Sequence, residues 1–362
     1  MCIILPTLLP FGGAERLAMT LAQDQIDRGH KVDLVLMNEP KDVSGDVPEG
    51  VRVFNLNAPR LRNALNPLSK YLKTEQPNVG IAFIWPLTVL SILAKAFGRS
   101  KTRIIVSDHN PLSIQYKDWG FVTRMFLKLS IWLSYRFADG RICVSEGVAN
   151  NVSQLAGLPV SHMEVIYNPI ALPVSTAKGR AVAEKLWDGW TGPRLLTLGR
   201  CKAQKNHKLL LDAFKIFLEN TEAKLMILGT GPLEDQTKAY AVEQGLEASV
   251  IMPGHVSSPA EYYECADVFV LSSDYEGFGN VIVEAMSFGL PIASTDCPAG
   301  PSEILNKGEY GELATIGNAA ELADAMRRAL KRSPDIAGQK RRAIEISGAD
   351  SLQKYNDIFF NN

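Results

Sequence analysis

The sequence contains few cysteines and no recognisable metal-binding motif. Its five cysteines are odd in number and widely scattered, and no C-x-x-C pair or neighbouring set of histidines accompanies them. No D-x-D metal motif is present, and Asp274-Tyr275-Glu276 is the nearest imitation. We therefore expect no disulfide framework, no bound metal and no cofactor, and the cysteine pattern favours a reducing cytoplasm.

No run of apolar residues is long enough to cross a bilayer. The longest uncharged run, Val79 to Ala94, has 16 residues and contains Pro86, whereas a spanning helix needs ~20. The apolar start from Cys2 to Phe11 lacks a basic leader, so we expect a first strand and loop there rather than a signal peptide. These features favour a cytoplasmic protein.

The composition is that of an ordinary globular protein. With 46% hydrophobic and 21% charged residues, it does not resemble disordered, collagen-like or coiled-coil chains. A chain of 362 residues is too long for one typical domain and predicts two.

The charge is unevenly distributed between the two halves. Residues 1–170 carry 18 lysines and arginines against 14 aspartates and glutamates, a net charge of +4, and the remainder carries 20 against 25, a net charge of −5. The positive excess lies between Arg60 and Arg141 and suggests an anionic partner, although a solvated basic face is an equal alternative. No helix-turn-helix or zinc-finger spacing supports nucleic-acid binding.

Short β-rich runs alternate with longer helical patterns along the whole chain, which predicts parallel sheets covered by helices. The clearest helical patterns are Ala14–Arg28 and Phe121–Phe137. Residues 169–193 are rich in Pro, Gly, Ser and Thr and predict a linker. The expected strands are Ile3–Leu5, Val32–Leu36, Val51–Phe54, Val79–Phe83, Ile104–Val106, Arg141–Val144 and Val165–Tyr167, then Leu195–Leu198, Lys224–Leu228, Val250–Met252, Val268–Leu271 and Ile292–Ser294.

Two strand-end loops have residues suited to an anion. Gly12-Gly13 follows the first strand and opens a helix, where free backbone N–H groups meet negative charge. Arg200 and Lys205 share the loop after Leu195–Leu198, and such cations bind diphosphates through charge-assisted hydrogen bonds. Taken alone, the glycine pair is better explained by a tight turn, and the two cations are better explained as surface residues.

The most informative segment runs from Ser272 to Ala285. It places two carboxylates, Glu276 and Glu284, eight residues apart around a glycine loop and the start of a helix. A carboxylate accepts two hydroxyl donors, which suits the vicinal hydroxyls of a sugar or ribose. An ordinary helix-surface glutamate is the alternative for Glu284.

Taken together, Gly12-Gly13, Gly199-Arg200 with Lys205, and Glu276-x7-Glu284 resemble, in order and spacing, the retaining glycosyltransferases of family four. The resemblance spans nearly the whole chain, and Cys297-Pro298-Ala299-Gly300-Pro301 is similar to the branch that builds bacterial surface and lipid-linked oligosaccharides. It implies the α/β GT-B fold, with two Rossmann-like domains facing across a cleft. The expected domains are residues 1–170 with a C-terminal helix at about 348–362, and residues 171–347.

The resemblance also implies roles for individual residues. Arg200 and Lys205 would bind the donor diphosphate and stabilise the leaving nucleotide, which other families do with a metal. Glu276 would hold donor sugar hydroxyls, and Glu284 would hold the ribose. The remaining donor-binding residues would be Gly12, Gly13, Val256, Gly277, Phe278, Gly279, Asn280 and Val281.

His109 lies in Ser107-Asp108-His109-Asn110-Pro111, where the resembling family keeps a histidine that faces the donor sugar. We expect it to be catalytic, together with Glu276, Arg200 and Lys205, and to act by hydrogen bonding rather than metal binding. The alternative is a loop histidine in a helix-capping cluster with Asp108 and Asn110.

The segment Phe121–Phe137 has no acidic residue, and Arg124, Lys128 and Arg136 stand among aromatic and aliphatic side chains. Such a helix is suited to an anionic membrane surface and suggests a lipid-linked acceptor. Core packing with a solvated basic edge is at least as good an explanation.

The resemblance thus implies a metal-independent, retaining glycosyltransferase that moves a hexose or N-acetylhexosamine from a nucleotide diphosphate donor, most commonly UDP in this branch, to a saccharide acceptor. Two alternatives stay open. The first is a nucleotide-sugar epimerase on the same fold, and the second is a non-catalytic sugar-nucleotide-binding protein.

Overall fold

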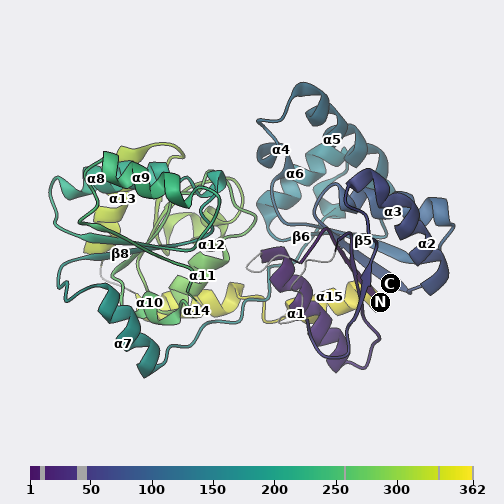
Figure 1. Ribbon diagram of the computed structural model, residues 1–362, viewed down its shortest axis with the longest axis horizontal. Coiled ribbons are helices and arrows are strands. Elements are labelled where there is room, and N and C mark those ends of the chain that lie inside the picture. Colours follow the sequence, from purple (N-terminus) through teal and green to yellow (C-terminus); the bar gives the residue numbers. More distant parts are fainter. Residues whose placement is uncertain (9–12, 39–46, 257, 333–334, 361–362) are drawn as a thin grey trace. The chain divides into compact units, whose positions relative to one another are not determined.

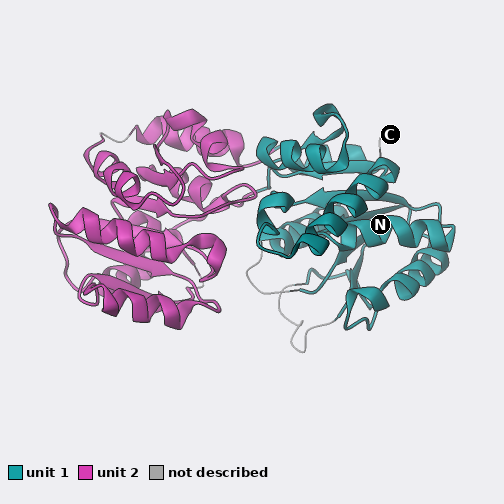
Figure 2. Ribbon diagram, turned by 90° about the horizontal axis from the view of Figure 1, so that it is seen from above, with its two compact units in different colours: residues 1–169, 350–362 teal, residues 170–349 magenta. Residues whose placement is uncertain are grey.

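The computed structural model describes residues 1–8, 13–38, 47–256, 258–332 and 335–360, and divides into two compact units. Unit 1 comprises Met1–Pro169 and Asp350–Asn362, and unit 2 comprises Ile170–Ala349 (Figure 2). Each unit has its own parallel sheet and its own hydrophobic core, as expected for two α/β domains.

Unit 1 is built on a seven-stranded parallel sheet in the order β3-β2-β1-β4-β5-β6-β7. The helices form two layers, with α1 and α15 on one face and α2, α3, α5 and α6 on the other (Figure 1). The strands are β1 (Cys2–Leu5), β2 (Asp33–Leu36), β3 (Arg52–Asn55), β4 (Val79–Phe83), β5 (Arg103–Asp108), β6 (Gly140–Cys143) and β7 (Glu164–Val165). The helices are α1 (Gly13–Asp27), α2 (Leu65–Glu75), α3 (Leu87–Gly98), α4 (Leu112–Gln115), α5 (Phe121–Ser134), α6 (Glu146–Ala156) and α15 (Ser351–Phe360).

The last helix completes the core of unit 1. Tyr355 and Phe359 of α15 are buried among the apolar side chains of α1 and the strands. The guanidinium of Arg103 donates to the carbonyls of Ile358 and Phe359 at 3.2 and 3.0 Å, so it satisfies two of the carbonyls that a helix end leaves unpaired.

Unit 2 has a six-stranded parallel sheet in the order β10-β9-β8-β11-β12-β13. Helices α8, α9 and α13 cover one face, and α11 and α14 cover the other (Figure 1). The strands are β8 (Arg194–Leu198), β9 (Lys224–Leu228), β10 (Val250–Gly254), β11 (Val268–Leu271), β12 (Ile292–Thr295) and β13 (Glu312–Ala314). The helices are α7 (Ala177–Leu186), α8 (His207–Leu218), α9 (Glu234–Glu243), α10 (Ala260–Glu264), α11 (Asn280–Ser287), α12 (Pro301–Ile304), α13 (Ala319–Lys331) and α14 (Ile336–Ile346).

Every expected strand is present, with ends shifted by at most two residues, because apolar runs mark parallel strands well. The three-residue strand β13 was not predicted, since so short a run has no distinct pattern. The expected helix Phe121–Phe137 ends at Ser134 and continues as the 3₁₀ turn η2 (Tyr135–Phe137). Among the described residues, no helix is long and apolar enough to span a bilayer.

Candidate functional site

The strand order of unit 2 reverses between β8 and β11. These two strands pair side by side, although 69 residues lie between Leu198 at the end of β8 and Val268 at the start of β11. The loops that leave such neighbours diverge, and ligands of open α/β sheets collect at this point. Here these are the loop containing Arg200 and Lys205 and the loop containing Glu276. The sheet topology therefore brings two of the sequence-predicted motifs together.

Backbone and amide hydrogen bonds tie these two loops to each other. The backbone N–H of Asp274 donates to the carbonyl of Gln204 at 2.9 Å, and the Gln204 side-chain amide donates to the carbonyl of Tyr275 at 2.8 Å. The hydroxyl of Ser272 donates to the carbonyl of Lys205 at 2.8 Å. The two loops are thereby held in one arrangement.

Asn206 joins the same loops and also begins α8. It adopts a left-handed conformation (φ 44°), and its side-chain oxygen accepts from the N–H of Leu209, so it is the N-cap of that helix. Its side-chain nitrogen donates to Asp274 Oδ1 at 2.8 Å. One asparagine therefore positions both the helix start and the neighbouring loop.

Lys205 and Glu276 form an ion pair inside this cluster. Lys205 Nζ lies 2.7 Å from Glu276 Oε1, and the side chains are only 14% and 8% exposed. The hydroxyl of Ser273 donates to the same oxygen at 2.6 Å, and Thr295 of β12 donates to the Ser273 carbonyl at 2.7 Å. Because both contacts fall on Oε1, the other carboxylate oxygen of Glu276 is the one suited to accept from a ligand.

Glycines allow the Glu276 loop to pass close to the loop after β12. Gly300 has φ +101°, and a Cβ there would lie 1.6 Å from the carbonyl oxygen of Phe278. Gly279 (φ +107°) is the N-cap residue of α11, which Asn280 and Val281 begin. Gly277 to Val281 therefore form the turn into a helix N-terminus beside Glu276, an arrangement compatible with anion binding.

Glu284 lies one turn into α11, on its buried side. It is 7% exposed, and its Oε2 accepts from the hydroxyl of the buried Tyr263 at 2.9 Å. This carboxylate is therefore held in place, unlike an ordinary helix-surface glutamate.

The remaining predicted donor-binding residues lie at loop positions. Arg200 is exposed directly after β8, and Val256 is half-buried after β10. In unit 1, Gly13 is the exposed first residue of α1. Gly12 lies outside the described residues.

His109 in unit 1 follows β5 and packs against the end of β4. Its ring stacks on Phe83 with centroids 5.0 Å apart, and its Nε2 lies 3.0 Å from the Ser107 hydroxyl. Part of the ring remains accessible to solvent. Desolvation by the surrounding protein atoms lowers the pKa of His109 to about 3, so the ring is neutral near pH 7.

Asp108 does not form the helix-capping cluster considered as an alternative for His109. Its Oδ1 lies 3.1 Å from the hydroxyl of Tyr135, and the N-cap residue of α4 is Pro111, which has no side-chain cap. Burial raises the pKa of Asp108 to about 7, against the lowering effect of the Tyr135 hydrogen bond.

Sequence reasoning assigned no role to Ser273, Thr295, Asn206 or Tyr263. Each lies at a strand end, at a helix end or inside a helix, where serine, threonine, asparagine and tyrosine are common. The only signal was proximity to a predicted motif. The partners of Tyr263, Thr295 and Asn206 are 21, 22 and 68 residues distant in the chain, so no local pattern identifies them. Ser273 is only three residues from its partner Glu276, but serine is too common in such loops for that spacing to indicate the contact.

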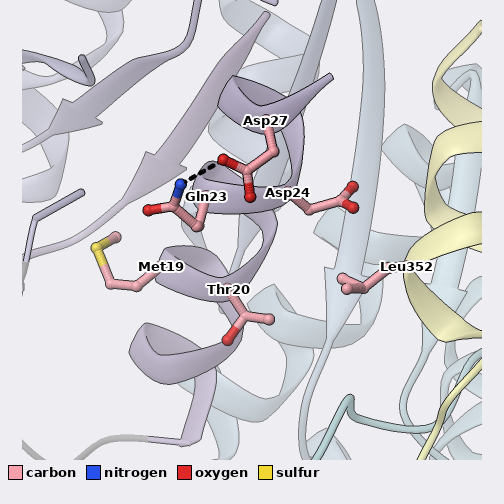
Figure 3. A pocket seen from close by; sticks show the side chains of 6 residues that line it. All are labelled: Met19, Thr20, Gln23, Asp24, Asp27 and Leu352. Carbon is pink, nitrogen blue, oxygen red and sulfur yellow. Dashed lines mark hydrogen bonds between the residues drawn. The ribbon is translucent and has the colours of Figure 1, made fainter. Parts of the chain in front are cut away.

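A separate, open surface pocket of about 430 Å³ lies along α1 (Figure 3). Met19, Thr20, Gln23, Asp24, Asp27 and Leu352 line it. Asp24 pairs with Arg28, and Asp27 accepts from Gln23, so its acids already have partners. In the described part of the chain, no group of three or more His, Cys, Asp or Glu side chains could hold a metal ion.

Models of known protein families match the sequences of both units. The Glycosyltransferase Family 4 model matches residues 11–172, and the Glycosyl transferases group 1 model matches residues 190–348. The chain is a family four glycosyltransferase. This enzyme is 28% identical over 337 residues to the N-acetylgalactosamine-N,N'-diacetylbacillosaminyl-diphospho-undecaprenol 4-alpha-N-acetylgalactosaminyltransferase of Campylobacter jejuni, covering 88% of this chain and 87% of that protein.

Two further similarities extend over nearly the whole glycosyltransferase. It is 26% identical over 357 residues to the amylovoran biosynthesis glycosyltransferase AmsD of Erwinia amylovora, covering 96% of this chain and 95% of that protein. The solved structure of Anabaena Alr3699/HepE in complex with UDP matches with a TM-score of 0.80 at 21% identity, covering 100% of both chains. This match confirms the expected GT-B fold.

Proposed function

We propose that this glycosyltransferase takes a hexose or N-acetylhexosamine from a UDP-sugar and transfers it, with retention at the anomeric carbon, to a lipid-linked saccharide in surface polysaccharide biosynthesis. The observation that carries the proposal is the Lys205–Glu276 pair, held between two loops at the strand-order reversal of unit 2. It offers one cation for a diphosphate and one carboxylate for sugar hydroxyls.

The donor would be held without a resident metal. Lys205 Nζ has three N–H donors, and the ion pair with Glu276 uses one, so the others can contact a diphosphate. As the bond from the sugar to the diphosphate breaks, negative charge grows on the leaving group, and Lys205 and Arg200 would stabilise it. Glu276 would accept from sugar hydroxyls, and Glu284 from the ribose.

His109 would assist by hydrogen bonding to the donor sugar. Because its pKa is lowered to about 3, the neutral ring cannot serve as a proton-donating acid near pH 7. We favour a reaction on one face of the sugar, in which the departing phosphate takes the proton of the acceptor hydroxyl. A trapped glycosyl–enzyme ester in mass spectrometry would contradict this route.

The acceptor assignment is supported by the relatives. The name of the Campylobacter protein contains a diphospho-undecaprenol acceptor, and the Erwinia protein belongs to amylovoran biosynthesis. Arg124, Lys128 and Arg136 are exposed on and just after α5. We propose that they meet anionic lipid at the inner face of the cytoplasmic membrane, where such an acceptor would be found.

The donor proposal is tested by thermal shift with a panel of nucleoside diphosphates and their sugars, in EDTA, on the wild type and on Lys205→Ala. A ligand at about a hundred times its dissociation constant adds ~2.7 kcal/mol of stability. We expect UDP and one UDP-sugar to stabilise the wild type, and Lys202→Ala in the same loop to behave like it. No shift with any nucleotide, or a shift that needs a divalent metal and ignores Lys205, would overturn the donor assignment.

A further inference from the structure

Helix α5 has two apolar faces, and the residues that the structure describes cover only one of them. Leu127 and Ile131, with Ser130 and Ser134, are buried toward the rest of unit 1. Seven large apolar side chains on the same helix are 43–80% exposed, namely Phe121, Val122, Met125, Phe126, Leu129, Trp132 and Leu133. We refer to these seven residues as the α5 outer face.

The outer face is continuous. At about 100° per residue, its seven side chains occupy an arc of roughly 140° around the helix axis, opposite the buried residues. Scattered apolar side chains are normal on a protein surface, but a contiguous patch of this kind marks an interaction site. The neighbouring helix α3 packs against α5 and η2 and exposes two more, Leu93 and Phe97, which are 40% and 71% exposed.

The charged side chains on α5 and η2 themselves all have one sign. No acidic residue occurs between Phe121 and Ala138. Arg124 and Lys128 flank the apolar arc on one side, and the Arg136 guanidinium lies 4.2 Å from the centre of the Trp132 ring. A second copy of the chain would bring like charges together across a shared apolar face, whereas an anionic lipid surface would complement them.

We propose that the α5 outer face inserts into the boundary between the headgroups and acyl chains of an anionic bilayer, with α5 lying parallel to the membrane plane. A helix of 14 residues is about 21 Å long, too short to cross the hydrocarbon core. This inference rests on the proposed function and deepens it by naming the apolar side chains that would enter the bilayer holding the lipid-linked acceptor. Insertion differs from electrostatic adsorption through Arg124, Lys128 and Arg136 in its dependence on salt. High salt screens the attraction between these cations and the lipid phosphates, but it does not weaken membrane binding by buried apolar side chains.

The first test is flotation with vesicles made of equal parts phosphatidylcholine and phosphatidylglycerol, with and without a high-salt wash. The variant is the triple substitution Phe121→Ser, Met125→Ser and Leu129→Ser. A matched control removes three exposed apolar side chains of unit 2, Val182→Ser, Val242→Ser and Ile344→Ser. We expect salt-resistant flotation of the wild type and the control, and at least a tenfold lower bound fraction for the α5 variant.

Insertion itself is measured by tryptophan fluorescence with lipids brominated on the acyl chain. Trp132 lies on the outer face, and we expect the brominated vesicles to quench the wild type and to quench Trp132→Phe less. Equal flotation of the α5 variant and the wild type, or complete release of the wild type by salt, would overturn the proposal. So would a dimer in sedimentation equilibrium without lipid that the α5 variant abolishes.

Failure here is distinguishable from failure of the proposed function. The nucleotide-binding residues Arg200, Lys205, Glu276 and Glu284 lie in unit 2, and α5 lies in unit 1. We expect the α5 variant to keep the full thermal shift with UDP. Vesicle binding without any thermal shift on nucleotide addition would support the membrane inference and overturn the donor assignment. A thermal shift with UDP but no vesicle binding would support the donor assignment and overturn the membrane inference.

Discussion

Lys205 and Glu276 form an ion pair of 2.7 Å across 71 residues of sequence, and each side chain is largely buried. The pair lies between the loops that follow two adjacent strands of unit 2. At this position Lys205 can stabilise the loop cluster and, as we propose, also bind an anionic donor.

The first prediction follows from this burial. Lys205→Ala leaves the Glu276 carboxylate without its counter-ion, and breaking a buried pair in this way costs about 3 kcal/mol in the free energy of unfolding. Urea denaturation measures the loss. Lys202→Ala, an exposed lysine of the same loop, should change stability by less than about 0.5 kcal/mol.

A double variant separates stability from binding. Adding Glu276→Gln to Lys205→Ala removes the uncompensated charge and should restore most of the lost stability, but not nucleotide binding. If the double variant stays as unstable as Lys205→Ala, the ion pair is not the cause.

Ser273 is predicted to be a positioning residue for Glu276. It is fully buried and donates to Glu276 Oε1, so Ser273→Ala would free that carboxylate to rotate away from the donor sugar. We expect kcat to fall about tenfold while KM changes little, since the contact affects orientation more than binding.

The matched control for Ser273 is Ser294→Ala. Ser294 is equally buried in the neighbouring strand, and its hydroxyl donates to the Thr295 carbonyl rather than to the site. Steady-state kinetics should show nearly normal kcat for this control. An equal fall in both variants would mean that Ser273 acts only through packing.

Gly300 is predicted to be irreplaceable for a steric reason. Gly300→Ala places a Cβ against the Phe278 carbonyl and should displace the Glu276 loop, with a loss of stability well above 1 kcal/mol and loss of the thermal shift with UDP. Gly308 has nearly the same φ, +100°, and open space around it. Gly308→Ala therefore measures only the free-energy cost of an alanine at positive φ. An equal loss of stability in Gly300→Ala and Gly308→Ala would disprove the clash.

The pH dependence of stability should carry a contribution from Asp108. Burial raises its pKa from 3.8 to about 7, so the folded protein holds a proton that the unfolded chain has already released. This contribution is present below about pH 4 and is lost as the pH rises toward 7. His109, with its lowered pKa, contributes with the opposite sign over much of the same range.

The comparison of wild type with Asp108→Asn isolates the Asp108 contribution, because His109 is common to both. Asparagine keeps an oxygen for the Tyr135 hydroxyl and does not titrate. Denaturation from pH 4 to 7 should show the variant gaining stability relative to the wild type as the pH rises. A constant difference over this range would contradict the raised pKa.

The sequence alone determined all but one of the strands that the structure describes, and the identity of the motif residues. Buried parallel strands are continuous apolar runs, so β4, β9 and β11 were predicted with their observed ends. The glycines, the cations and Glu276 of the predicted motifs come after β1, β8 and β11, and they are recognisable because loops after parallel strands hold ligands. The family assignment needed nothing more than these residues in order.

Only the tertiary structure decided which of those residues meet. The apolar pattern of a buried strand contains no information about its neighbours, so the pairing of β8 with β11, and hence of Lys205 with Glu276, could not be read from the local sequence. The same is true of Glu284 with Tyr263 and of Asp108 with Tyr135. On α5 the sequence showed apolar residues on every side, and packing against α3 and α6 decided which of them stay exposed.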